Sequence, residues 1–301
     1  MALADVLSAM REIILDAPQL PENFELREKL LRDRFPRLAA PELEDLARIN
    51  PSKFSIYTVS IFQGEKGILE NHFPITFELL KRHWTEAYAE KFVARIIPQK
   101  LHAIRPWKSQ SPLVFADNFC AFINQDCPEL IACRPDLGDI ARLENSTYRL
   151  RRAADPVPLL QKLRPVTAGS LASMVVADLL RLPLHVNPNI AALRLAYNVL
   201  PVREYFYTHE RSVLDAPSEH RETLLIGARN LRNTIYWLPV DNAIFNFFNS
   251  VAPQQSELTV ETFAEYALEN RPQAESETQA LEYLIQQLAL FMSHEYISIT
   301  L

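Results

Sequence analysis

The densest group of polar side chains that could do chemistry begins at Asp136. Asp136 and Asp139 are three residues apart, so in a helix their carboxylates would share a face and could bind a cation or act as an acid/base pair. In the first helical turn after Pro135, the same acids would instead cap free N–H groups and favour the helix dipole. Capping with solvent exposure is the favoured interpretation, and a protein-contact role stays open. The residues that would form this contact surface are Asp136, Asp139, Arg142 and Glu144.

Other signals for catalysis are absent from the sequence. None of the seven histidines is spaced as a metal-binding pair, and the sequence has no HExxH, CxxC or GxSxG motif. Five glycines against 21 prolines exclude the Gly-rich phosphate loops of nucleotide-binding folds. We therefore expect a protein that is not an enzyme and holds no cofactor or metal itself, with an independent enzyme built from distant residues as an open alternative.

The cysteines and the apolar stretches indicate a cellular compartment. Three cysteines lie between residues 120 and 133, and the first 20 residues lack the basic start and unbroken apolar region of a signal peptide. The most apolar stretch, Leu171–Leu182, is interrupted by Asp178 and Arg181. The sequence therefore predicts reduced thiols, a cytoplasmic location and no membrane span.

Chain length and hydrophobic periodicity predict the domains. A chain of 301 residues with 48% hydrophobic residues favours two folded domains, and the low glycine count favours helices joined by proline-containing turns over a many-stranded sheet. The first 52 residues are expected to form a helical extension and residues 53–160 an all-α domain for partner docking. The expected helices span residues 3–15, 22–35, 76–83, 86–97, 113–124 and 136–152.

After residue 160 the pattern changes to a mixture of strands and helices. A helix at 168–180, a strand at 190–197, helices at 241–251, 259–269 and 277–293 and a closing strand predict a small winged-helix-like α/β domain at 161–301. The fold class is therefore α+β and mostly α. Apolar runs at 223–227 and 234–238 predict a β-hairpin with a polar tip, and an exposed hairpin edge can accept an extended peptide. The residues proposed to bind it are Arg229, Arg232 and Tyr236.

The charge of the C-terminal segment argues against nucleic acid as a ligand. Residues 241–301 contain nine Asp or Glu residues and one basic residue, Arg271, for a local charge of −8. Binding to DNA depends on cations that neutralise phosphates, so helices in this segment would be repelled. A winged-helix DNA-binding transcription regulator nevertheless remains the alternative to a peptide-binding protein.

Several motifs resemble the HvfC/BufC-like family. They are Asn71-His-Phe-Pro74, Phe115-Ala-Asp-Asn-Phe119, Pro135-Asp-Leu-Gly-Asp-Ile-Ala-Arg-Leu-Glu144 and Leu224-Leu-Ile-Gly-Ala-Arg229. The similarity extends over roughly residues 53–301, and Asp-Ile-Ala-Arg-Leu-Glu is its most specific element. The first fifty residues and a longer stretch at 209–222 depart from the family pattern.

The resemblance implies a non-catalytic partner subunit in the biosynthesis of peptide natural products. Its helical domain would dock on a TIM-barrel, multinuclear non-haem iron oxidase to form a heterodimer, and its C-terminal domain, similar to a RiPP recognition element, would bind a precursor or carrier peptide. The iron and the chemistry would belong to the partner, and the peptide's cysteine would be the group modified, as in methanobactin formation or the route to 3-thiaglutamate.

Overall fold

The computed structural model describes residues 3–15, 20–53, 64, 67–83, 112–153, 166, 168–208, 214–251, 253, 257–269 and 276–300. Within these residues the protein is α+β and mostly helical, as predicted, with two three-stranded antiparallel sheets. The helix expected at 86–97 lies outside the described residues. Among the described helices, none combines the length and the apolar character needed to cross a membrane. The chain divides into two compact units, residues 1–122 and 123–301.

Three helices at the start of the first unit share a small core of their own. They are α1 (Leu3–Leu15), α2 (Phe24–Arg34) and α3 (Ala40–Arg48), and the buried residues between them include Ile13, Leu31 and Leu46. The buried Arg27 guanidinium joins α2 to the end of α3, because it donates to the carbonyl oxygens of Ala47 and Pro21, each at 2.7 Å. The predicted N-terminal helical segment is therefore confirmed as helical.

Prolines start the next helices. α5 (Pro74–His83), α7 (Pro112–Asp126) and α8 (Pro128–Cys133) each begin at a proline, whose missing N–H is not needed in the first helical turn. In the first unit, the Phe119 ring lies 4.8 Å from Phe73 and 5.5 Å from Phe77, centroid to centroid, and so links α7 to α5.

Of the three cysteines, Cys120 and Cys127 are buried and Cys133 is exposed.

The second unit contains both sheets. In one, β1 (Pro183–Val186) lies between β5 (Leu258–Thr259) and β6 (Ile297–Ile299). In the other, β3 (Thr223–Arg229) lies between β2 (Ile190–Leu195) and β4 (Ile235–Val240). β3 and β4 form the predicted hairpin, and Asn233 adopts a φ of 63° in its polar tip, a conformation that asparagine tolerates better than most residues.

The remaining helices of this unit are short, apart from the last. They are α11 (Ala168–Ala172), α12 (Val176–Leu180), α13 (Leu200–Tyr207), α14 (Asn242–Asn246), the π-helix η3 (Phe247–Val251), α15 (Val260–Glu269) and α16 (Glu277–Ser293). The helix expected at 168–180 is interrupted at residues 173–175, so that prediction was wrong in its continuity. Asp241 caps α14, since its Oδ1 accepts from the Ile244 N–H at 2.9 Å.

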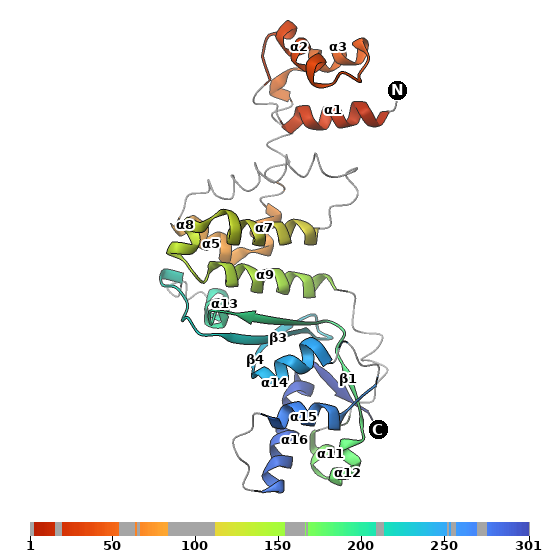
Figure 1. Ribbon diagram of the computed structural model, residues 1–301, viewed down its shortest axis with the longest axis vertical. Helices are drawn as coiled ribbons and strands as arrows, with labels where there is room; N and C mark the ends of the chain where they lie inside the picture. The colour runs from red at the N-terminus through yellow and green to blue at the C-terminus, as the bar shows by residue number, and fades with distance from the viewer. Residues whose placement is uncertain are drawn as a thin grey trace. The chain divides into compact units, whose positions relative to one another are not determined.

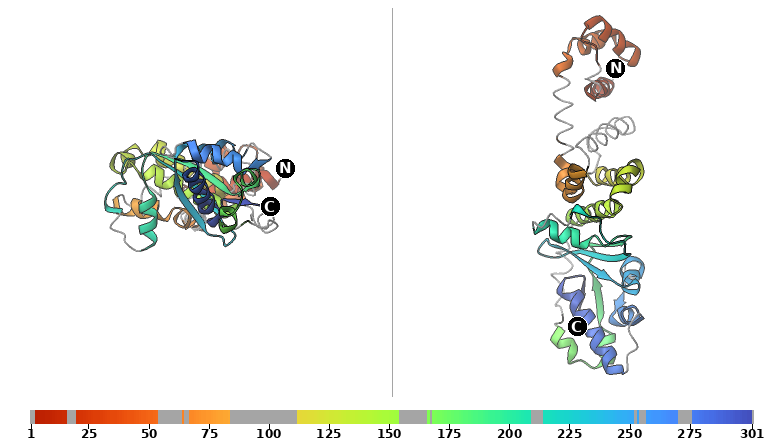
Figure 2. Two further views of the ribbon diagram at one scale, coloured as in Figure 1. Left: turned by 90° about the horizontal axis from the view of Figure 1, so that it is seen from below. Right: turned by 90° about the vertical axis from the view of Figure 1, so that its left-hand side faces the viewer.

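The sheet β2-β3-β4 lies between two helical layers. Helix α9 (Leu137–Arg152) packs against all three of its strands on one face. On the other face, Ile226 and Ala228 join a core that includes Phe247, Phe263 and Phe291. Figure 1 shows α9 and α14 on opposite sides of β3, and the right-hand view of Figure 2 shows the same order of layers from another side.

Helix α9 belongs to the same unit as the sheet β2-β3-β4. We predicted that residues 53–160 form one domain and 161–301 another, whereas the contacts place the division at 122/123 and give α9 to the second unit. An amphipathic pattern shows that a helix has one buried face but not which element covers it. Here part of the cover comes from strands 40 to 100 residues further along the chain.

Candidate functional site

The predicted docking residue Asp136 belongs to a buried ion pair. Arg134 Nε and Nη2 donate to its two carboxylate oxygens, each at 2.9 Å, and the two side chains are 2% and 0% exposed. Ser218 adds its N–H at 2.8 Å and its hydroxyl at 2.7 Å, while Arg134 Nη1 donates to the Leu214 carbonyl oxygen. The pair thus attaches residues 214–218 to the start of α9.

The capping interpretation was wrong for Asp136. Its side chain makes no hydrogen bond to the N–H groups of α9, and it is fully buried where solvent exposure was expected. The reason is the presence of Arg134 two residues earlier, which satisfies both carboxylate oxygens.

Asp139, like Asp136, binds backbone N–H groups of a segment that is distant in the sequence. Its Oδ2 accepts the N–H groups of Ala196 at 2.6 Å and Tyr197 at 3.0 Å, directly after β2, and its Oδ1 accepts from Arg142 at 3.1 Å. Glu144 is 6% exposed, whereas the Arg142 side chain is 45% exposed. The four predicted docking residues therefore do not share one accessible face, and two of the three carboxylates hold loops of the sheet domain in place.

A pH dependence follows from the buried pair. Burial would raise the pKa of Asp136, but the hydrogen bonds from Arg134 and Ser218 outweigh it, and the pKa lies below its ordinary value. A depressed folded-state pKa stabilises the fold above the unfolded-state pKa of about 3.9, and this contribution is lost as the pH falls through the folded-state value. We expect the stability difference between wild type and Asp136→Asn, measured by urea unfolding, to be largest near neutral pH and to shrink below about pH 4. A difference that stays constant down to pH 2 would contradict this assignment.

The three predicted peptide-binding residues have separate environments. Arg229 is 9% exposed, and its Nη1 donates to the carbonyl oxygens of Ala153 at 2.7 Å and Arg151 at 3.3 Å, at the C-terminal end of α9. Arg232 is exposed in the hairpin tip. Tyr236 is 41% exposed, and its ring meets His294 edge-on at 5.0 Å. Of the three, Arg232 and Tyr236 are thus accessible to a ligand.

Among the described residues, one edge of β4 has no strand partner. The Asn230 N–H donates to the Thr234 carbonyl oxygen at 2.9 Å. Hydrogen-bonded and non-hydrogen-bonded residue pairs alternate along an antiparallel ladder, so this bond fixes which pairs of β3 and β4 are hydrogen-bonded. The backbone groups of Tyr236, Leu238 and Val240 therefore point toward β3, and those of Ile235, Trp237 and Pro239 point away from it. Within the described residues, β4 pairs with β3 alone. Pro239 suits this place because its missing N–H lies on the unpaired side.

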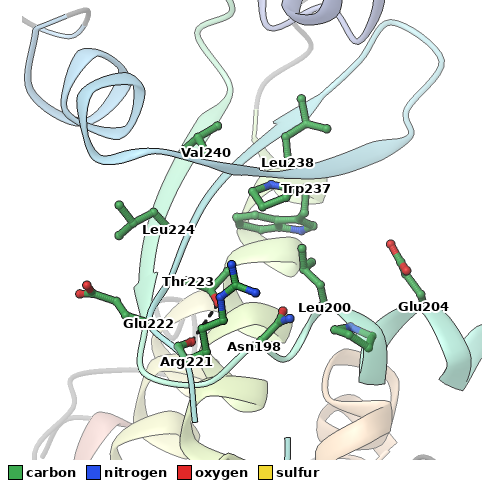
Figure 3. A pocket seen from close by; sticks show the side chains of 12 residues that line it. Asn198, Leu200, Glu204, Arg221, Glu222, Thr223, Leu224, Trp237, Leu238 and Val240 are labelled. Atoms are coloured by element: carbon green, nitrogen blue, oxygen red, sulfur yellow. Dashed lines mark hydrogen bonds between the residues drawn. The ribbon is translucent and has the colours of Figure 1, made fainter. Parts of the chain in front are cut away.

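A cavity of about 500 Å³ lies beside this edge (Figure 3). Side chains of α13 and of the loop before it face the end of β4 and the start of β3. The lining residues are Asn198, Leu200, Pro201, Glu204, Arg221, Glu222, Thr223, Leu224, Trp237, Leu238, Pro239 and Val240. The volume suits a few side chains of a bound peptide, and the lining combines apolar groups such as Leu200 and Trp237 with charged groups such as Glu204 and Arg221.

Trp237 is held rigidly in the wall of this cavity. Its indole N–H donates to Thr147 Oγ1 at 3.0 Å, and that hydroxyl donates to the Leu143 carbonyl oxygen at 2.8 Å. A Cβ added at Gly227 would lie 2.7 Å from three atoms of the indole ring. The ring therefore packs directly on the backbone of β3, where only glycine leaves room.

None of the three predicted peptide-binding residues lines this cavity. The sequence did contain a signal for the edge itself: a proline in the strand at Pro239 indicates an edge strand with that residue turned outward. No comparable signal linked residues 198–204 to residues 221–224. The residues just before these two segments, Tyr197 and Ser218, are held by Asp139 and Asp136, which lie far away in the sequence. No protein-family model and no curated protein matches the chain.

Proposed function

We propose that this protein is a peptide-binding subunit that holds an extended segment on the free edge of β4. The single observation that carries the proposal is the outward-facing backbone of Ile235, Trp237 and Pro239 next to a cavity. A strand edge supplies binding energy through main-chain hydrogen bonds, and an adjacent pocket supplies selectivity through side chains.

The proposed role is that of an accessory protein in peptide modification. The bound segment would be the leader of a precursor peptide, whose cysteine would then be presented to a multinuclear non-haem iron oxidase of TIM-barrel fold. Holding the peptide raises the effective concentration of its reacting group at the partner's centre. The motif resemblance supports this role, as do the hairpin and the helices after residue 168, which we interpret as a winged-helix-like peptide-recognition domain.

Regulation of transcription is the competing function. Glu257, just before β5, and Glu261, Glu265 and Glu269 along α15 are all exposed, in a segment whose formal charge is −8. A DNA-binding surface would require the opposite sign of charge. A salt-dependent shift of a 30-base-pair duplex at low micromolar protein would therefore count against our proposal.

Amide hydrogen exchange along β4 provides the test. Peptides that bind the full-length protein would be selected from a displayed library of random dodecapeptides. At saturation we expect exchange of the Ile235 and Trp237 amides to slow by about tenfold or more, since both N–H groups would donate to the added strand. The Tyr236 and Leu238 amides already donate to β3 and serve as internal controls. Binders that protect other segments, or no binders, would refute strand addition here.

The accessory role has its own measurement. Co-expression with an iron-oxidase barrel encoded beside this chain should yield one complex in size-exclusion chromatography, with iron in the complex and none in this chain purified alone. Separate elution of the two proteins would refute the partnership while leaving the peptide site to be judged by exchange.

A further inference from the structure

We infer that the segment held on β4 carries an aliphatic side chain in the cavity and a basic side chain two residues away. This inference rests on the proposed function and adds the chemistry of the ligand. It follows from which face of the added strand meets the cavity, from the apolar walls and from the charges at the rim.

Strand geometry selects which ligand side chains enter. Successive residues of a strand point to opposite faces, so ligand residues opposite Trp237 and Pro239 lie on the same face as the Trp237 indole. That is the face covered by α9, since Trp237 bonds to Thr147 of that helix. α13 lies beside this end of β4, because Leu200, Pro201 and Glu204 line the cavity together with Trp237. Two ligand residues that are separated by one other residue therefore share the cavity, and the residue between them points to the other face of the sheet.

The walls on this face favour an aliphatic group. Leu200 and Pro201 face Trp237 across the cavity, as Figure 3 shows for Leu200. The indole is held by Thr147 and by the close approach of Gly227, so it offers a fixed flat surface without reorganisation on binding. An apolar side chain placed against Leu200 and the Trp237 ring removes apolar surface of both partners from water.

The rim favours a positive charge over a negative one. Glu204 and Glu222 lie on opposite sides of the cavity, against the single guanidinium of Arg221 (Figure 3). Glu222 already has a cation nearby, because Arg194 Nη1 lies 3.4 Å from its Oε1. Glu204 is exposed on α13 and lines the cavity. The charge of the adjacent Arg203 acts on it, but the described residues place no cation in an ion pair with it, so it is the carboxylate that a ligand lysine or arginine would meet. The acidic C-terminal segment adds to the same preference at longer range.

The sequences of the selected dodecapeptides test this inference directly. We expect binders enriched in the pattern Leu, Ile or Val, any residue, then Lys or Arg, in either chain direction. A selected peptide should lose at least about fivefold in affinity on Leu200→Ser, because the aliphatic contact is lost. The matched control is Leu231→Ser at the hairpin tip, an exposed leucine outside the cavity, which should leave affinity unchanged.

Charge reversal separates the two halves of the inference. Glu204→Lys should weaken peptides with the basic residue and strengthen versions carrying Glu at that place, whereas Glu261→Lys on α15 should do neither. If selected peptides protect the Ile235 and Trp237 amides but show no such pattern, and both cavity variants bind normally, the inference is wrong and strand addition stands. If no selected peptide protects β4, the proposed function fails first.

Discussion

Replacing Arg134 with methionine is expected to lower the free energy of unfolding of the 123–301 unit by about 3–5 kcal/mol. The substitution leaves the Asp136 carboxylate buried without its cation, and it removes the donor to the Leu214 carbonyl oxygen. Breaking one partner of a buried pair costs more than the pair contributes, because the remaining charge stays desolvated. Urea unfolding followed by Trp237 fluorescence, in a background where Trp84 and Trp107 are phenylalanine, reports on this unit.

Two controls distinguish the effect of leaving a buried charge unpaired from the effect of losing any arginine charge. Arg142→Met removes an ion pair with Asp139 that is 45% exposed on the arginine side, and should cost below about 1 kcal/mol. The double variant Arg134→Met, Asp136→Leu should lose less than Arg134→Met alone, since no buried charge remains. Equal losses for Arg134→Met and Arg142→Met would show that the buried pair is not an anchor of the 214–218 loop.

Gly227→Ala is expected to destabilise the same unit by about 1–3 kcal/mol and to disturb peptide binding. The added methyl group would meet three indole atoms of Trp237 at 2.7 Å, so the ring must move from the wall of the cavity. Movement of the ring also breaks its hydrogen bond to Thr147 and leaves a buried N–H group without that acceptor. Urea unfolding should show the loss, and the Trp237 emission maximum in the same single-tryptophan background should shift to longer wavelength.

Gly169 provides the matched control for this substitution. It lies in α11, and beyond its chain neighbours and the backbone of its own helix no atom lies within 4 Å of the position its Cβ would take. Gly169→Ala should therefore be neutral or stabilising, by up to about 1 kcal/mol, because alanine favours the helix. A Gly227→Ala protein as stable as Gly169→Ala would contradict the packing of the indole on β3.

Local signals in the sequence were enough to predict most elements. The period of apolar residues in α1 predicted its helix from Leu3 to Leu15, and the apolar runs at 223–227 and 234–238 predicted the hairpin of β3 and β4. The same kind of reasoning predicted the overall class, α+β and mostly helical, which the structure confirms. These features depend on residues within a few positions of one another, so a single sequence contains them.

The candidate site could be predicted only in part. The hairpin edge was expected, but the cavity beside it depends on Asp136 and Asp139, whose backbone partners lie 57 to 82 residues later. A carboxylate at the start of a helix is normally exposed, and no local pattern distinguishes it from one that will be buried by a distant loop. For the same reason Arg229 was expected to face a ligand, whereas it binds the end of α9.

The order of synthesis has a consequence for α9. Its strand partners end at Val240, so a ribosome must add almost ninety residues after Arg152 before this face of the helix can be covered. At about 5–20 residues per second, the apolar side of α9 is without its sheet for several seconds. Contacts this far apart in sequence also form slowly because a long loop must close first. Nascent chains stalled before residue 240 should therefore be a preferred substrate of chaperones that bind exposed apolar helices, and chains stalled well beyond it should not.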